Sequence, residues 1–168
     1  MADWKTTSEA GFKFEDFCLD EVQKKFPLAY KNMKREDYSF YDIILFNGSF
    51  ASDYVPKTVE CKYDEMSYVS GNICIETGCY GRSSGLLITK ADYWMIGNGH
   101  EMFLIERTQI SQCIVDNMNE IMYRKNHPIK QEDGVVKDMN FYLIPKRIFI
   151  KYCLEYGDID KLTYDKLI

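Results

Sequence analysis

The chain has 168 residues, of which 46% are apolar and 15% aromatic, enough for a single domain with its own buried core. Its 21 basic and 26 acidic residues give a net charge of −5, which argues against a protein that coats nucleic acid through bulk positive charge. No apolar run reaches the ~18 residues of a membrane span and the N-terminus lacks the apolar centre of a signal peptide, so we expect a soluble, cytoplasmic protein without a membrane partner.

The first predicted element is an amphipathic helix over Ser8–Lys25. Thr6 and Glu9 fit a capping box, and apolar residues recur at helical spacing until Phe26-Pro27. Glu15 lies beside the apolar face, where it either points toward a neighbouring site or stays in solvent. These apolar residues are Ala10, Phe14, Phe17, Cys18 and Val22.

A polar, charged segment follows, and Lys31–Asp37 is predicted to be a loop. It carries Lys31, Lys34 and Arg35 close to Tyr30. Such a patch either meets phosphates or is a solvated connector.

Charged residues interrupt two predicted strands. The run Phe40–Phe46 is β-branched or aromatic and ends at Asn47-Gly48, but Asp42 lies within it. A buried carboxylate costs several kcal/mol unless a cation or hydrogen bonds meet it. In the next strand, Lys57–Tyr63, the alternation of a strand places Glu60 and Lys62 on one face. Val59 and Cys61 then lie on the other.

A third strand is predicted over Asn72–Thr77, after a turn-like connection. Cys74 and Glu76 share its polar face with Asn72. Glu76 is expected to neighbour Glu60 across the ladder, where two acids repel each other unless a cation lies between them.

The rest of the chain alternates helix and strand in a way typical of a mixed α/β domain. A stripe of apolar residues predicts a second long helix, which starts at Thr108 and ends before His127-Pro128. The tail after Gly157 either docks as one more turn or frays. The other predicted elements are a turn over Gly78–Gly85, a helix over Leu86–Ala91, strands over Asp92–Ile96 and Glu101–Ile105 joined by Gly97-Asn98-Gly99, a strand over Asn140–Ile144 and a helix from Pro145 to Cys153. The stripe is Ile110, Ile114, Met118, Ile121 and Met122.

The cysteines show no Cys-x-x-Cys pair and mostly have apolar neighbours. Reduced, buried thiols are therefore expected, and a zinc or iron–sulfur site is disfavoured. They are Cys18, Cys61, Cys74, Cys79, Cys113 and Cys153.

The order helix, strand with Asp42, strand with Glu60-Cys61-Lys62, strand, helix, strand resembles the core of the PD-(D/E)XK nuclease superfamily. The similarity covers roughly Phe14 to Ile105. One departure is that the first acid follows Tyr41 and not a proline. Three further segments resemble small phage-type members of the superfamily. They are Gly71–Glu76, Gly81–Gly85 and Thr89–Tyr93.

The resemblance implies a single α/β domain with a restriction-endonuclease-like core, a central mixed β-sheet flanked by helices. It also implies an endonuclease-like, metal-dependent hydrolysis of DNA phosphodiester bonds, including single-stranded or branched DNA as in Holliday-junction resolvases, with RNA as a further substrate class. Cutting a junction twice would favour a two-fold homodimer.

For the site, the resemblance implies that Asp42, Glu60 and the Cys61 backbone carbonyl hold Mg²⁺ or Mn²⁺, which prefer oxygen ligands. Lys62 would orient or deprotonate the nucleophile or contact the developing oxyanion. Glu76 is an additional catalytic acid, and Glu15 a weaker metal ligand.

Substrate binding is expected around the predicted helix that follows the glycine-rich turn. Hydroxyls, backbone amides and positive charge there would hold phosphates, or the segment is a helix entry with solvated side chains. The candidates are Arg82, Ser83, Ser84 and Lys90 for phosphates, and Tyr63, Tyr68 and Tyr80 for stacking on bases or for packing.

Other interpretations stay open. Asp42 and Glu60 could simply form buried ion pairs with Lys62. The chain could be a catalytically silent member of this fold that serves as a binding or inhibitor protein. The chain could also be an unrelated small-molecule enzyme or a structural α/β protein.

Overall fold

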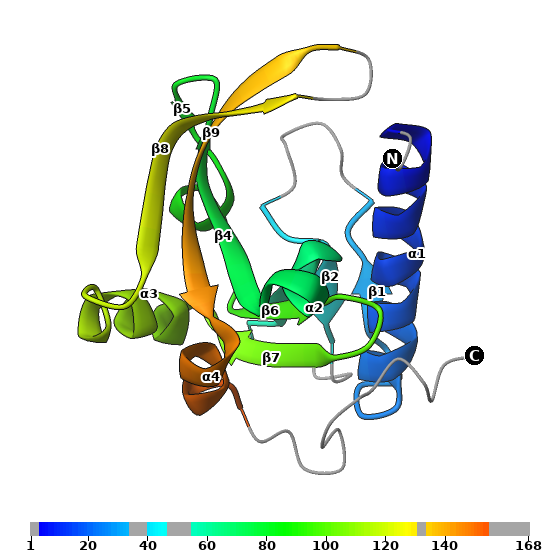
Figure 1. Cartoon of the computed structure of the whole chain (residues 1–168). Helices are drawn as coiled ribbons and strands as arrows, with labels where there is room; N and C mark the ends of the chain where they lie inside the picture. The colour runs from blue at the N-terminus through cyan, green and yellow to red at the C-terminus, as the bar shows by residue number, and fades with distance from the viewer. Residues whose placement is uncertain (1–3, 34–39, 47–54, 131–133, 155–168) are drawn as a thin grey trace.

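The computed structural model describes residues 4–33, 40–46, 55–130 and 134–154. Within them the chain is a mixed α/β structure in which helices pack around two β-sheets (Figure 1). The tail after Gly157 and the basic residues Lys34 and Arg35, for which we made predictions, lie outside the described residues.

The first sheet, sheet A, is mixed. Its central strands β3 (Lys57–Tyr63) and β6 (Tyr93–Gly97) run parallel, and all its other neighbours are antiparallel. The sheet order is β1 (Tyr30–Lys31), β2 (Ile43–Leu45), β3, β6 and β7 (Met102–Glu106).

The second sheet, sheet B, is antiparallel and has the order β5, β4, β9, β8. It is built around β4 (Asn72–Cys79) and the long hairpin of β8 (Met122–Lys130) and β9 (Val136–Pro145), with β5 (Arg82–Ser83) at its other edge. In Figure 1 these strands run steeply across the direction of β6 and β7.

Helix α1 (Trp4–Gln23) covers sheet A through one apolar cluster. Phe14, Cys18 and Val22 lie one helical turn apart and pack with Ile43 and Val59 of the sheet. The predicted stripe is therefore confirmed. The helix begins at Trp4, ahead of Thr6, so the capping-box prediction is wrong.

A second cluster fills the space between the two sheets. Trp94 and Ile96 of β6 meet Ile73 and Ile75 of β4 there. Helices α3 (Arg107–Asp116) and α4 (Lys146–Phe149) close this cluster, and a 3-10 turn η2 (Ile150–Tyr152) follows α4 in place of the longer predicted helix to Cys153.

The largest error of the sequence prediction concerns β8. The long helix expected from Thr108 onward ends at Asp116, and Met122–Lys130 is an edge strand paired with β9. Pro128 lacks an N–H but is tolerated on an edge strand, where one side needs no partner. Pairing with a distant strand overrides the local helical spacing of the methionines.

Smaller differences concern the connections. The helix predicted over Leu86–Ala91 is a single 3-10 turn, η1 (Gly85–Leu87), and the connection after β3 contains a short helix, α2 (Met66–Ser70). Gly85 has a φ of +50° and an added Cβ would lie 2.4 Å from the Glu76 carbonyl oxygen, so this turn requires glycine.

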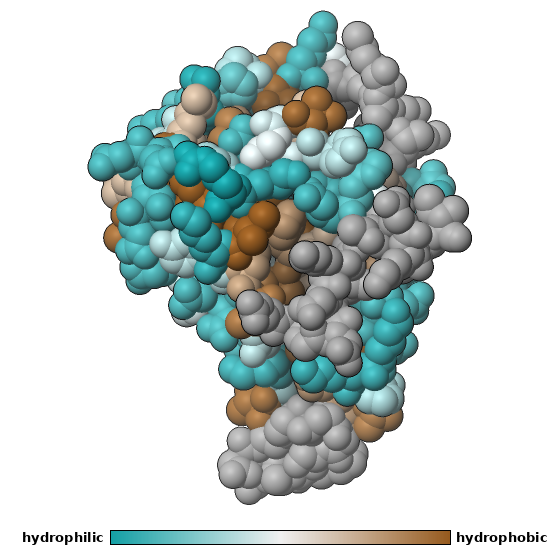
Figure 2. Space-filling model, turned by 60° about the horizontal axis from the view of Figure 1, so that its bottom comes forward, coloured by the Kyte–Doolittle hydropathy of each residue, from teal (hydrophilic) through white to brown (hydrophobic). Residues whose placement is uncertain are grey.

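The surface seen in Figure 2 is mostly hydrophilic with small hydrophobic groups between. No helix among the described residues is long and apolar enough to cross a membrane. All six cysteines are free thiols, as predicted, but only Cys18 and Cys113 are fully buried, and the other four are partly buried.

Candidate functional site

Asp42 is anchored to β3 at the point where β2 begins. Its N–H donates to the Val59 carbonyl at 2.8 Å, and its Oδ2 accepts from the Cys61 N–H at 2.7 Å. The N–H and C=O of one strand residue point to the same side of the strand. The Cys61 carbonyl therefore lies on the Asp42 side of β3, as an oxygen donor to a shared cation would have to.

The Cys61 side chain points away from the carboxylates, into the apolar cluster under α1. A hydrogen bond with Cys18, together with burial, raises the pKa of the Cys61 thiol. The thiol is thus held protonated, and the prediction that it points into the core is confirmed.

Glu60 projects from the opposite face of β3 and is partly buried. Thr89 Oγ1 lies 3.5 Å from its Oε2 and 2.9 Å from the Phe40 carbonyl oxygen, so the single proton of this hydroxyl is shared between two acceptors. Burial first and the Asp42 charge second raise the pKa of Glu60 to about 8, against the Lys62 charge, which lowers it.

Asp42 shows the same kind of perturbation. Burial raises its pKa to about 6, against the Cys61 hydrogen bond that lowers it, and the Glu15 charge adds to the increase. Glu15 also contributes to the raised pKa of Glu60. The charge of Glu15 on α1 therefore acts on both carboxylates, one at the start of β2 and one on β3, and disfavours their ionised forms.

Lys31 lies on β1 and not in the predicted loop. Its Nζ is 3.5 Å from Glu15 Oε2 and 2.6 Å from Asp16 Oδ1. The ammonium group is therefore engaged by α1, and the phosphate contact considered for Lys31 is not supported.

Glu76 reaches the site by a different route from the one predicted. It lies in sheet B and not beside Glu60 in a common ladder, because β3 pairs with β2 and β6 while β4 pairs with β5 and β9. Its Oε2 is 3.8 Å from Lys62 Nζ, with the two side chains 20% and 32% exposed. Glu76 therefore lies close to Lys62, although it belongs to the other sheet.

Asp64 links the two sheets directly after β3, because it forms a hydrogen bond with each of them. Its N–H donates to the Gly97 carbonyl of sheet A at 2.8 Å, and its Oδ2 accepts from the Cys74 N–H of sheet B at 2.9 Å. Burial raises the pKa of Asp64, while the Cys74 hydrogen bond and the Lys62 charge lower it. Sequence analysis missed this residue, although an acid directly after Tyr63 was a visible signal.

The predicted phosphate-binding residues separate into two groups. The Ser84 hydroxyl donates to Glu76 Oε1, so Ser84 supports the acid. Arg82 and Ser83 are exposed on the edge strand β5, and Lys90 Nζ lies 4.2 Å from the centre of the Phe40 ring. Lys90 is exposed as well, so Arg82, Ser83 and Lys90 face solvent as a phosphate would require.

The three tyrosines also differ. Tyr63 packs 5.7 Å from Phe14 between ring centres, and Tyr68 stacks at 3.8 Å on His100. Tyr80 is 53% exposed and has a positive φ of 51° beside Gly81. Packing accounts for Tyr63, whereas Tyr68 is as exposed as Tyr80, so stacking on bases stays a prediction for both of these rings.

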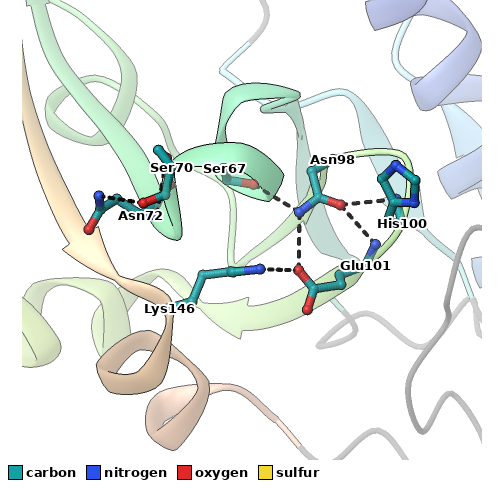
Figure 3. A network of polar contacts seen from close by, with 7 residues as sticks. All are labelled: Ser67, Ser70, Asn72, Asn98, His100, Glu101 and Lys146. Atoms are coloured by element: carbon teal, nitrogen blue, oxygen red, sulfur yellow. Dashed lines mark hydrogen bonds and ion pairs between the residues drawn. The ribbon is translucent and has the colours of Figure 1, made fainter.

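A polar network holds α2, which follows Lys62 in the chain, against the turn between β6 and β7 (Figure 3). The buried Asn98 amide donates to Ser67 Oγ at 3.0 Å and to Glu101 Oε2 at 3.2 Å, while its Oδ1 accepts from the N–H groups of His100 and Glu101. Lys146 pairs with Glu101 from the end of β9. The network fixes the backbone that follows Lys62.

The donor set at Asp42 and Glu60 fits a hard divalent cation. Magnesium is commonly bound by one or two carboxylates with the remaining positions filled by water or substrate oxygens. No group of three or more His, Cys, Asp or Glu side chains close enough to hold a metal ion occurs among the described residues. The chain offers two partly buried carboxylates with raised pKa values, of which Asp42 contributes to the raised pKa of Glu60, and a backbone carbonyl on the Asp42 side.

Comparisons of the chain with known proteins found no match. No protein-family model matches it, and no curated sequence and no solved structure matches it significantly. The resemblance to PD-(D/E)XK nucleases therefore rests on the residues themselves.

Proposed function

We propose that the protein is a metal-dependent nuclease with a restriction-endonuclease-like core, acting on the phosphodiester bonds of DNA. The observation that carries the proposal is the pair Asp42 and Glu60, two partly buried carboxylates with raised pKa values beside Lys62. Replacing a buried charged set by apolar residues is often neutral or stabilising, so such a set on core strands indicates use.

Asp42, Glu60 and the Cys61 carbonyl would hold Mg²⁺ or Mn²⁺, with Glu15 as an outer acid. When bound, the cation would lower the pKa of a water and offset charge on the phosphate. The Asp42–Cys61 hydrogen bond orients the first carboxylate before any ligand arrives. Preorganisation of this kind reduces the reorganisation needed during the reaction.

Lys62 is the residue best placed to act on the nucleophile or on the leaving charge. Its Nζ lies near Glu76, which in turn accepts from Ser84. The acid thus holds the ammonium group in place, where it would orient a water or donate to a developing phosphate oxyanion. Removing the lysine would leave the acids in place but remove this donor.

The test is cleavage of a supercoiled plasmid and of single-stranded DNA with Mg²⁺, Mn²⁺ or EDTA. Wild type should cut with metal only, and Lys62→Ala should lower the rate by about 100-fold or more. Lys57→Ala is the matched control, because Lys57 lies on the same strand but pairs with Asp92 at 2.9 Å on the surface. Equal activity of the Lys62 and Lys57 variants would overturn the assignment.

One observation favours a second function, a silent binding or inhibitor protein of the same fold. Metal sites with a third protein side chain are absent from the part of the chain that the structure describes. Wild type would then cut nothing under any metal, and Mn²⁺ soaked into crystals would not settle between Asp42 and Glu60. Metal-dependent cleavage that Lys62→Ala abolishes rejects this alternative.

A further inference from the structure

Strand β8, the outer strand of the β8–β9 hairpin, is a positively charged element that the site does not use. Strand β8 carries Arg124, Lys125 and Lys130 and no acid among its nine residues, in a chain whose net charge is −5. Every residue of β8 is exposed. Among the described residues, no carboxylate lies within ion-pair distance of these three side chains.

The register of sheet B connects this charge to the candidate site. Glu76 of β4 pairs with Phe141 of β9, and Phe141 pairs with Arg124 of β8. Residues directly opposite each other share a face, so Arg124 lies on the Glu76 face, two strands or about 10 Å away. His127 joins the same row, since its ring meets the Phe141 ring edge-on at 5.6 Å.

Two β-bulges meet at this row. The register shifts in β4 between Glu76 and Gly78 and in β8 between Arg124 and His127, both opposite Asn140. Bulges redirect side chains and bend strands, and they are frequent next to active sites. The hairpin strands bend near β5 in Figure 1.

Asn140 stabilises both irregularities. Its Oδ1 accepts from the Asn126 N–H at 2.7 Å, where Asn126 has a φ of +48°, and its carbonyl accepts from Thr77 Oγ1 at 3.2 Å. A Cβ on Gly78 would lie 2.7 Å from Asn140 Nδ2, so glycine leaves room for this side chain. The bend is thus built by specific contacts and is not a frayed edge.

Lysine and proline on an edge strand also prevent pairing with other chains, and that role accounts for Pro128 and Lys130. It does not account for Arg124, which lies two strands from Glu76 of the candidate site and next to a β-bulge in β8. Acids gathered at the site and bases on the adjoining arm form the charge pattern expected where a cation and a polyanion meet.

We propose that the β8–β9 hairpin is an arm that binds the phosphodiester backbone of the nucleic-acid strand leading to Glu76. This inference rests on the proposed function, which sets where the strand is cut. At a rise of 3.4 Å per nucleotide, about 10 Å places the Arg124 contact roughly three nucleotides from the scissile phosphate. The His127 ring on Phe141 offers a surface for a neighbouring base.

The experiment measures binding without cleavage. Fluorescence anisotropy of labelled single-stranded and duplex oligonucleotides is recorded in EDTA across a salt series, for wild type, Arg124→Gln/Lys125→Gln and the matched control Lys13→Gln/Lys151→Gln. Both variants lose two positive charges from exposed positions. Thermal unfolding checks that all three proteins are folded.

The arm variant should bind on the order of tenfold more weakly at moderate salt, and its log–log salt slope should fall by about 1.4 for single strands or 1.8 for duplex. The control should match wild type. Equal binding of both variants, or no binding by wild type, overturns the arm. The form of nucleic acid whose slope changes identifies the substrate.

The outcome is separable from that of the proposed function. If wild type binds through the arm but never cleaves with Mg²⁺ or Mn²⁺, the nuclease assignment fails and the arm stands. If Lys62→Ala stops cleavage while the arm variant binds and cleaves like wild type, the nuclease stands and the arm fails.

Discussion

Glu60→Gln tests whether a buried charge at the candidate site destabilises the metal-free protein. Glutamine keeps the size of the side chain and an oxygen that can accept from Thr89 Oγ1. It removes the negative charge that lies near Asp42 and Lys62. We expect the variant to be more stable than wild type at high pH without metal, and to lose stabilisation by metal.

The magnitude follows from the raised pKa of Glu60, about 8 against a usual 4.5. A raised value means that the folded state binds the proton more tightly, so ionisation lowers the free energy of unfolding. The penalty is absent below pH 4.5, grows between 4.5 and 8, and is complete above 8. Its upper bound is about 5 kcal/mol at about 1.4 kcal/mol per pH unit, and solvent at a partly buried carboxyl reduces it to about 2 kcal/mol.

The assay is thermal unfolding at pH 5, 7 and 9 in EDTA and in Mg²⁺. Glu60→Gln should raise the Tm by roughly 4–8 °C at pH 9 in EDTA and by little at pH 5, since about 1 kcal/mol corresponds to 2–4 °C in a chain of this length. Magnesium should raise the Tm of wild type and not that of the variant. Glu65→Gln is the matched control, because Glu65 is exposed.

Two results would refute the reasoning. One is a Glu60→Gln variant no more stable than Glu65→Gln at pH 9, which would mean that ionised Glu60 is not destabilised by the fold. The other is equal stabilisation of wild type and Glu60→Gln by magnesium, which would place the cation elsewhere.

Two further substitutions separate structure from chemistry. Cys61→Ala should lower the free energy of unfolding by about 1–2 kcal/mol in urea, because the side chain packs in the cluster under α1. It should leave cleavage intact, because only the backbone of this residue faces the proposed site. Lost cleavage in a stable variant would give the thiol a chemical role. Gly97→Ala should lower the free energy of unfolding by about 1–3 kcal/mol, since the new Cβ would lie 2.4 Å from the Phe14 ring. In a double-mutant cycle, Phe14→Leu should recover part of this loss. Strictly additive effects of the two substitutions would contradict the clash.

The sequence by itself determined the features that depend on local periodicity. The helical stripe of Phe14, Cys18 and Val22 is packed as predicted, and the alternation along β3 separates Glu60 and Lys62 from the buried Val59. Both patterns follow from the geometry of one helix and one strand, so neighbours along the chain suffice to predict them. Asp42 was identified for the same reason, as an acid inside an apolar run.

Only the tertiary structure decided which strands pair. Glu76 comes near Lys62 from a second sheet, and Met122–Lys130 pairs with β9 although its methionines are spaced as in a helix. Strand partners far apart in the sequence leave no periodic signal in either strand. The row from Glu76 through Phe141 to Arg124 depends on two such pairings, and therefore no reading of neighbouring residues could assemble it.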